Sequence, residues 1–310
     1  MIRFYALFLI FSFLVFGQPA AHGGDAPRVA VSIKPIHSLV AGVMKGSGEP
    51  ALILRGGASP HTYSLKPSGM RVLQRARLVF WVGPELEAFL RKPLANLSGG
   101  SRAIALSRVE EISAGGHASE SHRRRGDRHG DRHGHSNAEA DMHIWLDPVN
   151  ARRMVKVIEK ELSRADEARA ALYHTNASKL TRKLKILESS IRILLGSVVG
   201  VPYIVFHDAY RVFESRFGLR PLGALTLSPG RSPGAKRLAA IRRKIHTLGA
   251  KCVFAEPQFT PRLVRTAVEG SGARVGVLDP LGVDLKAGEE MYFSLMRGLA
   301  SSLVECLTPR

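Results

Sequence analysis

Three histidines lie in short segments that contain turn residues: His61 in GASPHTYS, His143 in HIWLDP and His207 in VFHDAY. Neutral imidazole nitrogen is a common ligand for zinc and other first-row metals. Asp279, in VLDPLG, follows an apolar run as His207 does and would add one carboxylate oxygen. Three nitrogens and one oxygen suit a tetrahedral zinc site. These four residues therefore predict a metal site.

Three further polar residues lie near these segments. Asp208 and Glu256 would orient the imidazole rings or close a contact between domains, although helix capping or ion pairing explains them equally well. His37 follows the first expected strand and is a weaker candidate for approaching the metal.

Short apolar strands alternate along the chain with helical patterns, and these elements must position the candidate residues. The expected strands cover residues 29–33, 51–54, 78–82, 103–106, 203–206, 223–226, 252–255 and 274–278. Such alternation is typical of parallel sheets covered by helices on both faces. Ligands of such sheets gather beyond the carboxyl ends of the strands. His61, His207 and Asp279 each follow an expected strand, and His143 precedes a helix that starts near Asp147 and Pro148.

The predicted fold is α/β, with two lobes that each hold a mostly parallel four-stranded sheet flanked by helices. A chain of 310 residues is long enough for two domains, each with its own core. Residues 166–195 favour a helix and contain no Pro or Gly. We expect an N-terminal lobe over 26–164, a long rigid linking helix over 165–196 and a C-terminal lobe over 197–310.

The N-terminus has the features of a secretory signal peptide over residues 1–23. Arg3 precedes an apolar run over residues 4–16, and small residues follow at Ala20 and Ala21. The run is too short for a spanning helix, which needs about 20 residues. No cysteine near the cleavage region would carry a lipid anchor. We expect an exported monomer without a stable membrane anchor, which in a Gram-negative cell is periplasmic.

The two cysteines, Cys252 and Cys306, would meet an oxidising environment in an exported protein, so one disulfide is expected. Two buried thiols are the alternative. A metal role is disfavoured because the pair lacks CxxC spacing.

Residues 114–140 have no apolar periodicity and interrupt the first lobe as an expected disordered loop. Its histidines are His117, His122, His129, His133 and His135. These histidines either form an auxiliary weak metal site or are incidental residues of a solvated charged loop. The formal charge of +19 raises the possibility of nucleic-acid binding, but the basic residues are spread out, with one dense run at 123–125. No nucleic-acid partner is expected.

The four metal-site segments, together with AEPQF at 255–259 and PLGAL at 221–225, resemble the solute-binding proteins of zinc-uptake ABC transporters. The resemblance extends from about Val29 to the C-terminus. It implies that the protein captures Zn²⁺ between its lobes and delivers it to an inner-membrane ABC permease, with no chemical reaction. It also implies that the long helix is a rigid spine.

Two other functions remain open. A manganese- or iron-binding protein of the same transporter class commonly uses two histidines and two carboxylates, which are harder ligands, and the third histidine favours zinc. A zinc-dependent hydrolase would need an open position for water. The sequence contains no HExxH motif, and Asp279 would fill the coordination position that the water needs.

Overall fold

The computed structural model describes residues 26–97, 99–112, 141–226 and 234–309. The expected signal peptide and the His-rich loop lie outside these residues. Within them, eight short strands form two four-stranded parallel sheets, as predicted. The strands are β1 (Val29–Val31), β2 (Ala51–Leu52), β3 (Leu78–Trp81), β4 (Arg102–Ala105), β5 (Tyr203–His207), β6 (Gly223–Thr226), β7 (Cys252–Ala255) and β8 (Arg274–Val277).

The two sheets have the same topology, with strand orders β2-β1-β3-β4 and β6-β5-β7-β8. Every strand pair is parallel. The central strands are rich in β-branched and aromatic residues and buried on both faces, as expected for sheets covered by helices. The helices are α1 (Lys34–Met44), α2 (Pro67–Arg75), α3 (Arg91–Ala95), α4 (Pro148–Ala165), α5 (Ala170–Leu195), α6 (Arg211–Phe217), α7 (Ala235–Thr247), α8 (Arg262–Val268) and α9 (Met291–Leu307).

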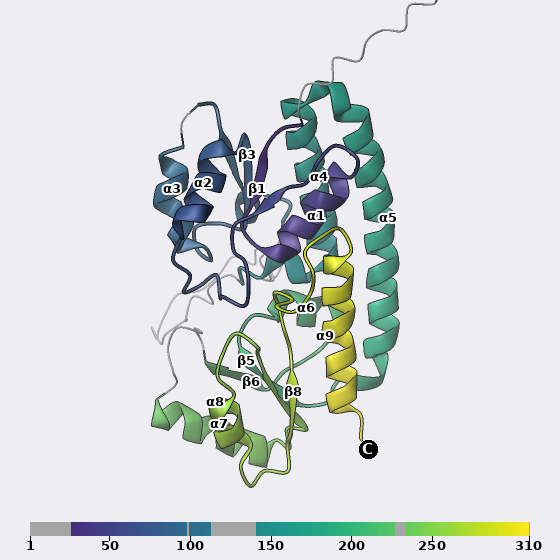
Figure 1. Ribbon diagram of the computed structural model, residues 1–310. Helices are drawn as coiled ribbons and strands as arrows, with labels where there is room; N and C mark the ends of the chain where they lie inside the picture. Colours follow the sequence, from purple (N-terminus) through teal and green to yellow (C-terminus); the bar gives the residue numbers. More distant parts are fainter. Residues whose placement is uncertain (1–25, 98, 113–140, 227–233, 310) are drawn as a thin grey trace, which may run out of the picture.

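The long helix α5 runs along both lobes, with α9 beside it in the C-terminal half of its length (Figure 1). It has 26 residues and so spans about 39 Å at 1.5 Å per residue. It starts a few residues later than the sequence suggests, because Asp166 is not helical and separates α4 from a short 3₁₀ turn at Glu167–Arg169. The Asp166 carboxylate accepts hydrogen bonds from Arg169 and Tyr173, which stabilises this break.

The lobes share one hydrophobic core, which differs from the expectation of two separate cores. A single cluster of buried side chains contains Phe80 from the first sheet, Leu184 from α5 and Phe254 from the second sheet. Each sheet also has a smaller cluster on its opposite face. The shared cluster exists because α1, α4 and α9 all pack against α5. Relative motion of the lobes therefore disturbs buried apolar contacts.

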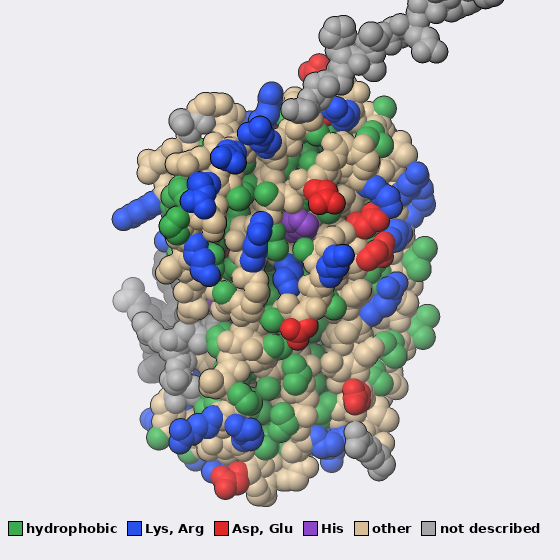
Figure 2. Space-filling view, viewed as in Figure 1, with side chains coloured by type: hydrophobic (Ala, Val, Ile, Leu, Met, Phe, Trp, Pro, Cys, Tyr) green, Lys and Arg blue, Asp and Glu red, His purple; other side chains and the backbone are tan. Residues whose placement is uncertain are grey.

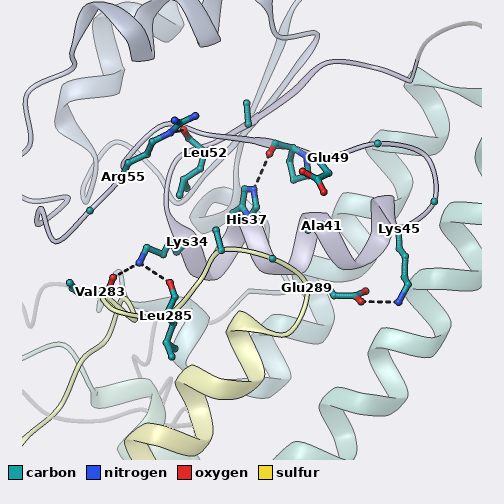
Figure 3. Close-up of a pocket in the computed structure, with 17 residues that line it drawn as sticks. Lys34, His37, Ala41, Lys45, Glu49, Leu52, Arg55, Val283, Leu285 and Glu289 are labelled. Carbon is teal, nitrogen blue, oxygen red and sulfur yellow. Dashed lines mark hydrogen bonds and ion pairs between the residues drawn. The ribbon is translucent and has the colours of Figure 1, made fainter.

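Polar contacts also join the two lobes. Lys34, at the start of α1, donates hydrogen bonds to the carbonyl oxygens of Gly282, Val283 and Leu285 at 2.7, 2.6 and 3.1 Å. Figure 3 shows this lysine reaching from the N-terminal lobe to the loop after β8. Arg216 of α6 forms a bidentate ion pair with Asp147, and both of its bonds measure 2.8 Å.

The expected disulfide is present, since Cys252 and Cys306 are bonded and join β7 to α9. Among the described residues no helix is long and apolar enough to cross a membrane. On the face shown in Figure 2, Lys and Arg side chains are scattered over both lobes with acidic side chains between them.

Candidate metal centre

His207 is the last residue of β5 and is held by the carboxylate of Glu256, which directly follows the neighbouring strand β7. Strands β5 and β7 pair Ile204 with Val253, and the same offset places Glu256 beside His207. The Nδ1 atom of His207 lies 2.6 Å from Glu256 Oε1. A carboxylate oxygen only accepts, so Nδ1 carries the hydrogen and the Nε2 lone pair is left for a ligand. His207 is 4% exposed.

His143 has a matching arrangement just before the 3₁₀ turn Ile144–Leu146 and helix α4. Its Nδ1 donates to Asp141 Oδ1 at 2.7 Å, and the same oxygen accepts from the His143 backbone N–H at 2.9 Å. Burial alone would raise the pKa of Asp141, but the His143 ring and the backbone N–H groups of His143 and Val212 lower it. The neighbouring Trp145 is fully buried and donates to the Pro280 carbonyl oxygen at 2.8 Å.

His61 comes from the turn between β2 and α2 and approaches from the N-terminal lobe. Its backbone N–H donates to Ser59 Oγ at 3.4 Å. No hydrogen-bonded carboxylate supports this ring among the residues that the structure describes. Burial, followed by the charges of His143 and His207, lowers the pKa of His61 to about 3. Its ring is therefore neutral at physiological pH.

The three imidazoles converge on one point between the lobes. His143 Nε2 lies 3.2 Å from His61 Nε2 and 3.2 Å from His207 Nε2, and the ligand atoms of all three lie within 4.8 Å of one another. In a tetrahedral zinc site the ligand nitrogens lie about 3.3 Å apart, given Zn–N bonds of about 2.0–2.1 Å. The lone pairs of His143 and His207 repel each other at this distance unless a cation lies between them. The geometry fits a small metal ion.

Asp279, the expected fourth ligand, is not brought into this cluster. Its Oδ1 accepts from Gln258 Nε2 at 2.8 Å and from the backbone N–H groups of Leu281 and Gly282 at 3.0 Å each, and its Oδ2 accepts from the Val283 N–H at 2.5 Å. Four donors therefore hold the carboxylate on its own loop. In this geometry the carboxylate is engaged away from the three imidazoles.

The other predicted residues have different positions. Asp208 forms an ion pair with Arg211, which is one of the alternatives given for it above. Glu256 orients the imidazole ring of His207. His37 lies on α1 with Nε2 2.9 Å from the Pro50 carbonyl oxygen, and it lines a separate pocket with Lys34 and Arg55 (Figure 3). Burial is the main cause of its lowered pKa. The five loop histidines lie outside the described residues.

The sequence analysis missed two residues at the centre. Asp141 holds His143, and the signal for it was a carboxylate two residues before the histidine. Gln258 lines the cavity together with the three histidines. It lies two residues after Glu256, but no local pattern indicated that its side chain faces the metal site.

Comparisons with known proteins relate the whole chain to zinc-uptake proteins. Residues 29–306 match the family model described as zinc-uptake complex component A, periplasmic (ZnuA). The high-affinity zinc uptake system protein ZnuA of Brucella suis biovar 1 is 41% identical, with 98% of each chain covered. That of Yersinia pestis is 36% identical, with 90% of this chain and 91% of the relative covered.

Solved structures of low sequence identity show the same fold. A crystal structure of ZnuA aligns with a TM-score of 0.75 at 22% identity, covering 92% of this chain and all of that chain. A Mn-bound periplasmic metal-binding protein from Candidatus Liberibacter asiaticus aligns with a TM-score of 0.74 at 19% identity, covering 91% of this chain and all of that chain. With a family model that matches nearly its whole length, the chain belongs to the ZnuA family of periplasmic zinc-uptake components.

Proposed function

We propose that His61, His143 and His207 bind one Zn²⁺ ion through their Nε2 atoms in the cavity between the lobes. The observation that carries the proposal is the pair of 3.2 Å separations between these nitrogens, which suits tetrahedral coordination. Asp141 and Glu256 support it, because each holds a ring in the tautomer that leaves Nε2 free to coordinate. The chain is a component of a zinc-uptake system and not an enzyme, as its family membership establishes.

Three neutral nitrogens favour zinc over the harder manganese and iron ions. Those ions prefer sites with more carboxylate oxygen. The carboxylates of Asp141 and Glu256 bind the Nδ1 atoms of two of these rings and so act as hydrogen-bond acceptors. With Asp279 held on its loop, the fourth position of a tetrahedral ion is open to water.

The protein captures the ion and delivers it to an inner-membrane ABC permease. The shared core and the Lys34 and Arg216 contacts oppose wide separation of the lobes. Release then depends on small shifts of the lobes and on movement of the loop that carries His61. In this proposal the signal peptide over residues 1–23 directs export.

Metal competition tests the proposal. Untagged protein is stripped of metal and reloaded from mixtures of zinc and manganese, and the bound metals are quantified. We expect one tightly bound zinc per chain, with manganese displaced. One tightly bound manganese per chain in equimolar mixtures would reject zinc as the cargo. Retention of tight zinc binding in the triple variant His61→Ala, His143→Ala, His207→Ala would reject the site.

A further inference from the structure

Gln258 has one half of its side-chain amide engaged and the other half without a partner. Its Nε2 donates to Asp279 Oδ1 at 2.8 Å. The amide orientation follows from chemistry, because a carboxylate oxygen accepts hydrogen bonds and only the NH₂ end can donate. Among the described residues Gln258 Oε1 is buried and has no hydrogen-bond partner. A buried acceptor without a partner costs free energy, on the order of 1–3 kcal/mol.

The unpartnered oxygen belongs to a residue that lines the metal cavity. Gln258 shares this cavity with His61, His143 and His207, and much of the remaining lining is apolar, including Phe259 and Leu281. The cavity volume is about 10 Å³. That is about the space that one water molecule needs. A group of the size of one water therefore fits the space, and among the described residues it would meet two buried oxygens without a partner, Gln258 Oε1 and Glu256 Oε2.

We infer that Gln258 is a positioning residue for the fourth coordination position of the zinc site. Its Oε1 accepts a hydrogen bond from the water that completes the coordination, while its Nε2 keeps Asp279 outside the coordination sphere. This inference rests on the proposed function. It explains how a chain with a carboxylate near its metal site keeps a nitrogen-rich site, which is the softer site that suits zinc.

Lys34, from the N-terminal lobe, also holds the loop that follows Asp279. Asp279 accepts from the backbone N–H groups of residues 281–283, and Lys34 donates to the carbonyl oxygens of Gly282 and Val283. The loop is thus fixed from both sides. Gln258 needs to restrain only the carboxylate, because the backbone around it is already held.

The test uses Gln258→Leu, which removes both the acceptor and the donor, with Gln74→Leu on the exposed face of α2 as the matched control. We expect zinc affinity, measured by competition with a chelator, to fall about ten- to hundredfold in Gln258→Leu, as is typical when a residue that supports a metal site is lost. Gln74→Leu should match the wild type. Zinc affinity within about threefold of wild type in Gln258→Leu would overturn the inference.

Azide binding to cobalt-loaded protein, followed by visible absorption, tests the role of the oxygen itself. Azide has no hydrogen to donate, so the Gln258 oxygen opposes it, and Gln258→Leu should bind azide more tightly by about threefold or more. A purely structural role would not raise azide affinity. Asp279→Asn should bind azide as wild type does. Azide that binds Asp279→Asn but not the wild type would place Asp279 in the fourth position and overturn the inference.

These outcomes are separable from failure of the proposed function. If the three histidines do not bind zinc, His207→Ala keeps its zinc affinity whatever the Gln258 variants do. Thermal unfolding of the metal-free variants checks folding. If Gln258→Leu does not fold, the azide comparison between wild type and Asp279→Asn decides the matter.

Discussion

The three histidines of the metal centre are supported in two different ways. His143 and His207 are 5% and 4% exposed, and each has its Nδ1 atom fixed by a buried carboxylate. His61 is partly exposed, comes from a turn and has no such carboxylate among the described residues. Two of the three proposed ligands are therefore preset by hydrogen bonds to carboxylates, and the third is not. We expect His61 to be the ligand that moves when the ion enters or leaves.

Removal of the histidines themselves tests this difference between His207 and His61 and should give the largest effect. His207→Ala should lower zinc affinity by more than about a hundredfold, because loss of a ligand should exceed the ten- to hundredfold effect typical of a supporting residue. His61→Ala should lower it less, since the two preset imidazoles remain. Chelator competition titrations measure both, with the exposed His246→Ala as control.

An equal loss in His61→Ala and His207→Ala would remove the distinction between preset and mobile ligands. An affinity within about threefold of wild type in His207→Ala would show that His207 does not bind the metal.

The supporting carboxylates should give the next largest effect. Asp141→Asn and Glu256→Gln keep similar shapes but weaken the acceptor for Nδ1, so each should lower zinc affinity about ten- to hundredfold. The exposed Glu110→Gln is the control. Isothermal titration with a competing chelator measures the change. If both variants bind zinc as wild type does, the carboxylates do not preset the rings.

The stability of the metal-free protein should depend on pH through His61. Its pKa is lowered to about 3 in the folded state, mainly by burial, against about 6.5 in the unfolded chain. The unfolded state therefore binds a proton first as pH falls below about 6.5, and the folded state loses stability, on the order of 2 kcal/mol by pH 5. His61→Gln should lose less over the same range. Urea unfolding of both proteins at pH 7 and pH 5 measures the difference.

The lowered pKa of His61 also limits how steeply zinc affinity can depend on pH. A neutral His61 does not release a proton when zinc binds between pH 5 and pH 7, so at most two imidazole protons compete with the ion there. A pH dependence of affinity that requires three protons would contradict the lowered pKa of His61. Identical pH dependence of stability in wild type and His61→Gln would contradict it as well.

The smallest effect is expected from the His-rich segment. Deletion of residues 116–136 should leave the tight zinc site unchanged, because the three converging histidines and their carboxylates all lie outside it. Only additional weak equivalents of zinc should disappear from a titration. Loss of the tight site on deletion would place a primary ligand within the segment.

The sequence alone determined the elements and indicated the three histidines that the structure brings together. The strands and α5 follow from local apolar patterns and from a long stretch without Pro or Gly, so the fold class was predictable. His61, His143 and His207 were recognisable from the short segments that contain them, which resemble those of zinc-uptake solute-binding proteins. The disulfide followed from having two cysteines in an exported chain.

The tertiary structure alone decided which polar groups meet these rings. Asp208 and Glu256 were equal candidates, but consecutive side chains on a strand point to opposite faces, and Asp208 follows the end of β5 and pairs with Arg211. Glu256 reaches His207 because β7 lies next to β5 in a register that no local pattern contains. Asp279 likewise turned to backbone donors on its own loop. Local patterns fix periodicity, whereas the choice among nearby carboxylates depends on strand order and register, which are set by packing across the whole chain.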